Sequence, residues 1–149
     1  MSFTPYQLLG KPMYHMCVKA QWEEVSKAGT AYFPPTYDDD RRKTHASMHA
    51  DKLLATANHF YKSSSPAEEE WICIQLDPTC LLEKVGISTL VEEPEAVGGR
   101  DAETVVTSTI RYPHIYGGIP TSIQGVVTGI FPMTRSSSDG RFLDIPGLL

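Results

Sequence analysis

The sequence predicts an α+β fold with a mainly antiparallel sheet and two helices early in the chain. Both stretches with helical periodicity, Gln21–Ala28 and Met48–Tyr61, lie in the first half. Most stretches with strand character come later, and no internal repeat is visible. The 149 residues fit one domain, with a core from about residue 11 to about residue 143 and short tails.

The composition is that of an ordinary globular protein, with 41% hydrophobic and 21% charged residues. No apolar run approaches the roughly 18 residues that a membrane helix needs, and the first residues do not form a signal peptide. The three cysteines are an odd number without CxxC spacing, which favours reduced thiols in a cytoplasmic protein. We therefore expect a soluble, cytoplasmic protein that does not contact a membrane.

The first strand is predicted at Tyr14–Val18. Alternation along this strand places His15 on the same face as Met13 and Cys17, so that its ring points into a mostly apolar layer. The helix Gln21–Ala28 follows, and Gly29 stands where a left-handed C-cap belongs.

The segment Tyr32–Lys43 is predicted to be a surface loop, because its two prolines exclude a central strand. Its second half, Asp38–Lys43, consists of six charged residues and is expected to be a solvated charge run. A short extended piece, Lys43–Ala46, then ends at Ser47, the predicted N-cap of the helix Met48–Tyr61.

The second half of the chain supplies most of the predicted strands. Trp71–Leu76, Leu90–Glu92 and Val126–Phe131 are apolar and rich in β-branched residues. Pro94–Glu103 is predicted to be an acidic loop, and a turn at Ser138–Gly140 precedes a last extended piece.

The segment Ile110–Pro120 combines two prolines, two glycines, two tyrosines, a histidine and an arginine. This mixture fits neither a helix face nor an alternating strand, and it predicts a rigid loop that carries a site. His114 and Tyr116 would be held between Pro113 and the pair Gly117-Gly118.

The charges are unevenly distributed. Residues 66–103 contain ten acidic and two basic residues, net −8, whereas the rest contains eight acidic and eleven basic residues, net +3. The acidic part argues against a nucleic-acid partner, which needs a basic face. Arg41, Arg42 and Lys43 precede the predicted Ser47-capped helix and favour a phosphate-sized anion there, unless Asp38–Asp40 merely neutralises them on a wet loop.

The five histidines are the remaining candidates for chemistry. His45 and His49 lie four residues apart, but the predicted cap at Ser47 puts His45 outside the helix, and no metal site is expected. His59 on the helix is interpreted as a structural or surface residue. His15 fits a core histidine as well as a site residue, while the loop position of His114 favours a function.

Several motifs resemble one known family. They are Tyr14-His15-Met16, the segment from Trp22 to Tyr32, His45-Ala46-Ser47, Ala57-Asn58-His59-Phe60-Tyr61, Pro113-His114-Ile115-Tyr116-Gly117-Gly118 and Asp139-Gly140-Arg141-Phe142. In this order they are similar to domain-of-unknown-function family 952, over about Met13 to Leu143. One difference is Arg42-Lys43-Thr44, where the family usually has Gly-Phe-Ile before the histidine.

That family in turn resembles, remotely, the ADP-ribosyltransferase fold, which implies a split antiparallel sheet with NAD or an ADP-ribose-like ligand in its cleft. The resemblance implies that His15 contacts a ribose hydroxyl and that His45-Ala46-Ser47 matches a His-x-x-Ser-type element. The catalytic glutamate of that fold has no clear counterpart, and Glu92 and Glu93 are only candidates.

Two hypotheses about function follow. The first is an enzyme or former enzyme, a transferase or hydrolase, acting on a nucleotide-like or phosphorylated small ligand. The second is a non-catalytic module that binds a small molecule or a protein, with structural histidines. In the first hypothesis the catalytic residues, which line one cleft, are His15, His45, His114 and Tyr116. Its ligand-binding residues are Arg41, Arg42, Ser47, Arg111 and Gly117.

Overall fold

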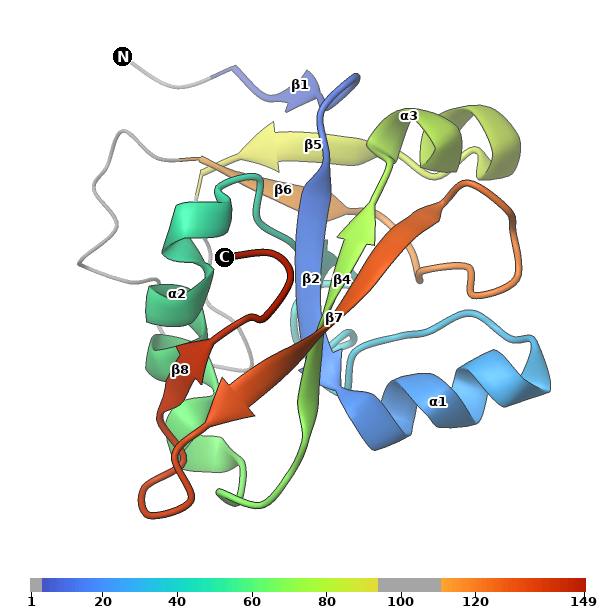
Figure 1. Cartoon of the computed structure of the whole chain (residues 1–149). Coiled ribbons are helices and arrows are strands. Elements are labelled where there is room, and N and C mark those ends of the chain that lie inside the picture. Colours follow the sequence, from blue (N-terminus) through green and yellow to red (C-terminus); the bar gives the residue numbers. More distant parts are fainter. Residues whose placement is uncertain (1–3, 94–110) are drawn as a thin grey trace.

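The computed structural model describes residues 4–93 and 111–149, which form two antiparallel four-stranded sheets (Figure 1). Sheet A has the order β1-β5-β6-β3, and sheet B has the order β2-β4-β7-β8. The strands of sheet A are β1 (Tyr6–Gln7), β5 (Thr89–Glu92), β6 (Tyr112–Ile115) and β3 (Thr44–His45). Those of sheet B are β2 (Met13–Val18), β4 (Trp71–Leu76), β7 (Val127–Arg135) and β8 (Phe142–Asp144). The predicted α+β class with antiparallel sheets is therefore confirmed.

The predicted strands β2, β4 and β5 lie where their apolar patterns placed them, and β7 extends further than expected, to Arg135. A turn before Gly140, which has a φ of 78°, leads into β8. The predicted acidic loop Pro94–Glu103 lies outside the described residues. Among those that are described, no helix has both the length and the apolar character to cross a membrane.

The first helix, α1, spans Lys19–Ala28 and confirms the predicted helix Gln21–Ala28, with two more residues at its start. Gly29 ends it with a φ of 72°, in the left-handed conformation that the sequence predicted. Trp22 is buried from this helix and packs against Tyr32, with ring centroids 5.6 Å apart.

The second helix begins later than predicted. The helix α2 spans Leu53–Phe60, after a 3₁₀ turn at Ala50–Lys52 and before another at Lys62–Ser64. The prediction that Ser47 is its N-cap is therefore wrong. Ser47 instead pairs with Tyr14 of β2: each N–H donates to the carbonyl of the other residue, at 2.7 and 2.8 Å. This bridge joins the end of the β3 segment to sheet B.

A third helical segment was missed by the sequence analysis. The short helix α3 (Pro78–Cys80) continues as a π-helix over Leu81–Val85. The Asp77 carboxylate caps it by accepting from two backbone N–H groups, proline occupies the first position, and Gly86 ends it with a φ of 76°. All three signals are local, but Asp77-Pro78 directly follows the predicted strand Trp71–Leu76 and is also typical of the end of a strand.

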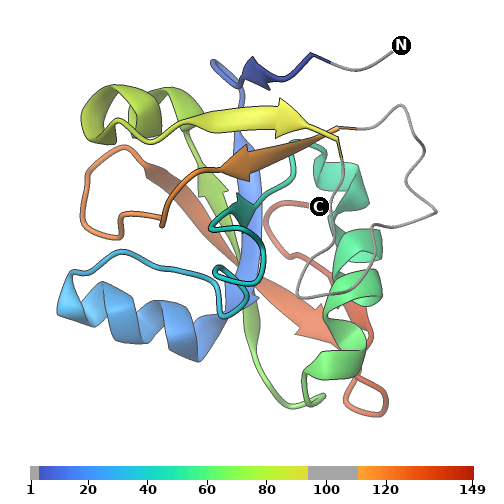
Figure 2. The same ribbon diagram turned by 180° about the vertical axis from the view of Figure 1, so that it is seen from behind.

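The second expectation that the structure corrects concerns Ile110–Pro120. Tyr112–Ile115 is not a loop but the strand β6, which pairs with both β5 and β3. Pro113 is tolerated within the strand because it lacks only the backbone N–H. Its carbonyl still accepts from the N–H of Ala46 at 3.1 Å. The turn-rich part begins only after Ile115. Figure 2 shows β6 between β5 and β3.

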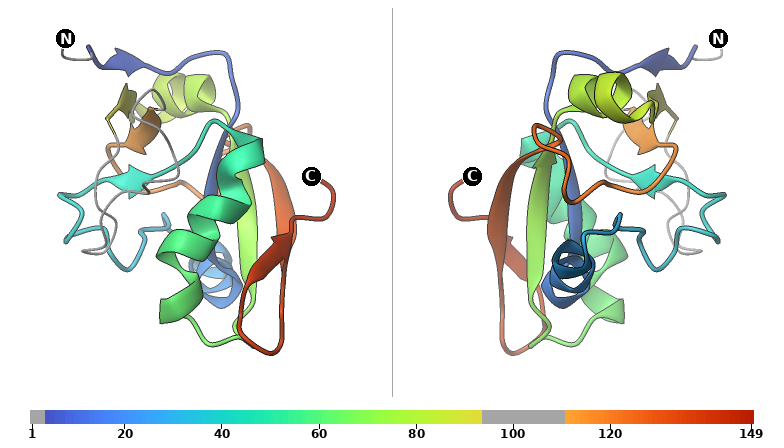
Figure 3. Two further views of the ribbon diagram at one scale, coloured as in Figure 1. Left: turned by 90° about the vertical axis from the view of Figure 1, so that its left-hand side faces the viewer. Right: turned by 90° about the vertical axis from the view of Figure 1, so that its right-hand side faces the viewer.

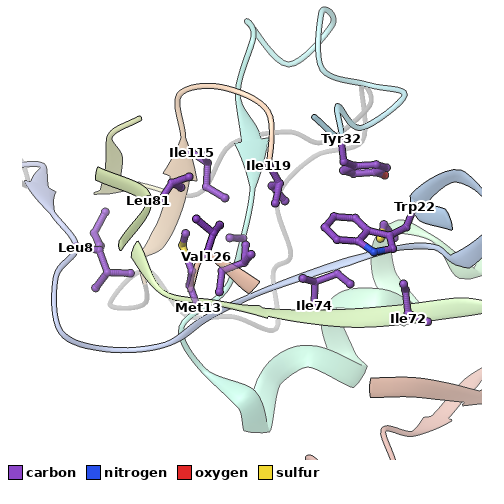
Figure 4. Packing of buried hydrophobic residues seen from close by; sticks show 14 residues of the cluster. Leu8, Met13, Trp22, Tyr32, Ile72, Ile74, Leu81, Ile115, Ile119 and Val126 are labelled. Atoms are coloured by element: carbon purple, nitrogen blue, oxygen red, sulfur yellow. The ribbon is translucent and has the colours of Figure 1, made fainter. Parts of the chain in front are cut away.

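The main core lies between the two sheets and beneath α1. Met13 and Cys17 of β2 face it, as predicted, together with Ile74 of β4, Ile115 of β6 and Val91 of β5 (Figure 4). The opposite face of sheet B packs against α2 through a second cluster, which includes Tyr14, Trp71 and Leu53. Figure 3 shows sheet A on one side of sheet B. His15 alternates onto the same face of β2 as Met13 and Cys17, and its ring reaches the backbone of His45 in sheet A.

Candidate functional site

Polar side chains gather where the two sheets meet. His15 of β2 lies in sheet B, and its Nδ1 is 2.6 Å from the backbone carbonyl oxygen of His45, in β3 of sheet A. Because a carbonyl oxygen can only accept, His15 Nδ1 carries the hydrogen. The side chain is buried, and burial lowers the pKa of His15 to about 4, although the hydrogen bond to His45 acts in the opposite direction. The ring is therefore neutral at pH 7, and its Nε2 is an acceptor.

A second contact in this region joins the side chains of His45 and His114. These residues lie opposite each other in the β3–β6 pair, which places both side chains on the same face of sheet A. Their rings meet edge to face, with centroids 4.9 Å apart and an interplanar angle of 88°. The Nε2 atom of His45 lies 3.4 Å from Oδ2 of Asp40, which is itself buried.

His114 has a carboxylate of its own. Its Nδ1 lies 2.9 Å from Oε1 of Glu92, the last residue of β5. The hydroxyl of Tyr116 donates to the same oxygen at 2.6 Å. Glu92 pairs with Tyr112 across the β5–β6 ladder, so its side chain reaches His114 diagonally on the same face of the sheet. His114 is completely buried, whereas Tyr116 is 39% exposed.

The loop before β3 brings further charge to the cluster. Asp40 and Lys43 are buried, so the expectation of a solvated charge run is wrong for both, while Arg41 and Arg42 between them are exposed. Asp40 also accepts from the hydroxyl of Thr36 at 2.7 Å. Arg41 and Arg42 have φ values of 59° and 60°, a left-handed conformation that costs non-glycine residues about 1–2 kcal/mol each. The buried residues Asp40 and Lys43 flank this left-handed pair.

Lys43 lies beside Tyr116. Its Nζ atom is 5.6 Å from the centre of the tyrosine ring, and the side chain is only 8% exposed. The next residue, Thr44, donates from its hydroxyl to the carbonyl of Gly117 at 2.8 Å. The contact of Lys43 with Tyr116 and the bond of Thr44 to Gly117 thus join the loop before β3 to the turn after β6.

A pocket of about 240 Å³ opens beside His15. It runs along the outer edge of β2 and is bounded by the loop that begins at Tyr32 and by the segment from Tyr61 to Trp71. Of the four residues predicted to line one cleft, the described lining includes His15 alone. The other three touch one another through Glu92 and the histidine rings, so a cleft shared by all four stays a prediction.

The structure places the remaining predicted site residues differently. Arg111 lies at the start of the β6 segment and pairs with Glu93 at 3.4 Å. Ser47 forms the bridge to Tyr14, with its hydroxyl 3.2 Å from the N–H of His49. Gly117 contributes a carbonyl to Thr44, as described above. None of these three contacts joins the histidine cluster directly.

Two residues of the cluster, Asp40 and Glu92, were not predicted as site residues, and Lys43 was predicted only as part of the basic run that favours an anion. Asp40 gave no signal, because its burial depends on how the loop closes. Glu92 was named only as a candidate glutamate, and pairing Leu90–Glu92 with Tyr112–Ile115 would have placed it near His114. Within residues 4–93 and 111–149, no cluster of three histidine, cysteine or acidic side chains suits a metal ion.

The sequence matches, over residues 16–128, the model of a family described as "Protein of unknown function (DUF952)". This chain belongs to the DUF952 family. The matched range contains the cluster from Asp40 to Tyr116 and the second half of β2, whereas His15 lies just before it. No curated protein matches this DUF952 chain in sequence.

Solved structures of one protein share the fold. The crystal structure of protein CC0527 from Caulobacter crescentus has a TM-score of 0.55 and 16% identity, and the match covers 89% of this chain and 94% of that chain. Its solution NMR structure gives a TM-score of 0.54 and 17% identity, with 92% of both chains covered. At this identity the likeness shows the fold alone.

Proposed function

We propose that this DUF952 protein is an enzyme, or a former enzyme, that acts on a nucleotide-like or phosphorylated small ligand. The observation that carries the proposal is the contact of His45 with His114, each beside its own carboxylate, where the two sheets meet. A histidine oriented by a carboxylate is suited to general acid–base chemistry, because its ring position and tautomer are fixed.

Within this pair we assign the contact with the ligand to His45. The side chain of His45 is 12% exposed, whereas that of His114 is 1% exposed and cannot reach a ligand in this conformation. Asp40 would orient the His45 ring through Nε2. The left-handed backbone at Arg41 and Arg42 supports a site here, because strained residues of this kind cluster at functional sites.

His15 is proposed to accept a hydrogen bond from a ligand hydroxyl. Its Nε2 is buried and lacks a hydrogen-bond partner among the described residues. The neighbouring edge of β2 offers the backbone of Met16 as well. The N–H and C=O of Tyr14 point away from β4 and are bonded to Ser47, and alternation gives those of Met16 the same direction, beside the pocket. Both features support the role that the ADP-ribosyltransferase resemblance implies for His15.

Basic residues beside the cluster would hold an anionic group. Arg41 and Arg42 are exposed, and Lys43 lies next to Tyr116. A Ser47-capped helix does not contribute to this anion site, since α2 begins at Leu53. The three bases alone still favour a phosphate-sized group over an extended nucleic acid.

Thermal-shift titration tests this proposal, with ADP-ribose, NAD and inorganic phosphate as separate probes. A ligand at 100 times its dissociation constant should stabilise the protein by about 2.7 kcal/mol. The Asp40→Asn and Arg41→Ala/Arg42→Ala variants should lose this stabilisation, while Lys27→Ala on α1 should retain it. The proposal is abandoned if none of the probes stabilises the wild-type protein, or if the site variants respond as it does.

The complete burial of His114 favours the alternative, a non-catalytic binding module with structural histidines. Chromatography of wild-type protein incubated with NAD or ADP-ribose separates the two. Consumption of either compound, lost in His45→Ala, supports an enzyme. Binding without consumption supports the module.

A further inference from the structure

The contacts of Tyr116 differ from those of the histidines around it. Its hydroxyl is 2.6 Å from Oε1 of Glu92, a distance typical of a charge-assisted bond from a hydroxyl to a carboxylate. The side chain is 39% exposed, whereas Glu92 is 18% exposed and His114 1% exposed. Exposure therefore decreases stepwise along the series from Tyr116 through Glu92 to His114.

Glu92 is fixed from two sides. His114 Nδ1 lies 2.9 Å from the same oxygen that accepts from Tyr116. Since a carboxylate can only accept, both neighbours donate, and the Glu92 carboxylate is held between a buried ring and an exposed phenol. The pairing of β5 with β6 sets this geometry, because Glu92 and His114 are diagonal neighbours on one face of sheet A.

We propose that Tyr116 is the group that contacts a ligand hydroxyl, with Glu92 as the base that receives the tyrosine proton and His114 as the positioning residue of Glu92. In this step the ligand O–H proton moves to Tyr116 Oη, and the proton already on Tyr116 moves to Glu92 Oε1. The ligand oxygen is left as a nucleophile, and Glu92 becomes a neutral carboxylic acid. His114 exchanges no proton and keeps its Nδ1–H directed at Oε1.

This inference rests on the proposed function, since it assigns a contact with the ligand of that function. Its test does not need that ligand. N-acetylimidazole acetylates tyrosine: a bond forms between Oη and the acetyl carbon, the acetyl–imidazole bond breaks, and the phenol proton leaves with imidazole. A carboxylate that accepts the phenol proton should accelerate this attack, since general base catalysis contributes about 10²–10⁴-fold in enzymes.

The experiment measures the acetylation rate of each tyrosine by peptide mass spectrometry, with Tyr6, which is 48% exposed, as the reference inside the same molecule. Glu92→Gln retains an oxygen that can accept from Tyr116 but cannot take its proton. We expect the rate at Tyr116, relative to Tyr6, to fall by about tenfold or more in this variant. An unchanged ratio in folded Glu92→Gln protein overturns the role of Glu92.

His114 is tested by two substitutions. The amide N–H of His114→Asn can replace the Nδ1–H donor, so the relative rate at Tyr116 should stay within about threefold of wild type, whereas His114→Ala should lower it further. If His114→Ala does not fold, His114→Asn alone decides: a rate as low as that of Glu92→Gln contradicts the positioning role. Failure of ADP-ribose to bind would count against the proposed function but would not alter these ligand-free rates.

Discussion

The imidazole of His15 donates from Nδ1 to the carbonyl oxygen of His45 across 2.6 Å, and this bond joins one sheet to the other. This bond uses the side chain of His15 and the backbone of His45. The His45 ring stays available to contact His114. The cluster is thus positioned by the same contact that holds the sheets together, and several measurable consequences follow.

The first prediction concerns the pH dependence that His15 gives to stability. Its pKa falls from 6.5 to about 4 on folding, so between these values the unfolded chain binds a proton that the folded chain excludes. The contribution of neutral His15 to the free energy of unfolding should be fully present above pH 6.5. The free energy of unfolding should then decrease by roughly 3 kcal/mol as the pH falls towards 4. Urea denaturation of wild type and His15→Gln should show this decrease only in wild type, with His59→Gln as control. Equal pH dependence in wild type and His15→Gln would contradict the prediction.

The second prediction concerns Asn58, which links α2 to β8. Its side-chain amide donates to the carbonyl of Phe142 at 3.0 Å, and its Oδ1 accepts from the Phe142 N–H at 2.7 Å. Asn58→Ala removes the side-chain partners of both the N–H and the carbonyl of Phe142, and it should lower the free energy of unfolding by about 1–3 kcal/mol. Ala55→Ser, at an exposed position on the same helix, should change it by less than about 0.5 kcal/mol. Similar chemical-denaturation midpoints for the two variants would rule out this role.

A third prediction concerns Arg135 at the end of β7. Its guanidinium donates to the carbonyls of Gly140, Ser65, Pro66 and Glu69 and to the hydroxyl of Ser65, at 2.7–3.1 Å. Arg135→Lys keeps the charge but loses the planar fork, so it should destabilise the protein by about 1–2 kcal/mol. Arg141→Lys, at an exposed position, is the matched control. Equal thermal midpoints for both variants would show that the network contributes little.

The fourth prediction concerns thiol reactivity. Burial raises the pKa of Cys73 to about 12 and also raises that of Cys17, whereas Cys80 is only partly buried. Because the thiolate is the reactive form, Ellman's reagent should modify Cys80 alone in the folded protein at pH 8. All three should react in guanidinium chloride. Rapid modification of Cys17 or Cys73 in the native protein, identified by mass spectrometry, would contradict the burial of sheet B.

The local elements and the faces of the central strands could be predicted from patterns in the sequence. Period-two alternation placed His15 with Met13 and Cys17 on the core face of β2, and Gly29 marked the end of α1. Such features depend on neighbours within a few residues, so a single sequence contains the information. The same local reasoning failed at Ser47, because an N-cap residue and a bridge residue have the same polar side chain. Only the pairing with Tyr14 distinguishes them.

Which polar residues meet depends on contacts between distant parts of the chain. Glu92 reaches His114 over 22 positions, and His15 reaches His45 over 30, through strand pairings that no local pattern specifies. Asp40 is buried because the loop closes over His45, although its sequence neighbours are exposed. The physical reason is that a strand pattern fixes which face a side chain takes, whereas its neighbours on that face depend on strand order and register. Those are set by the burial of the whole core.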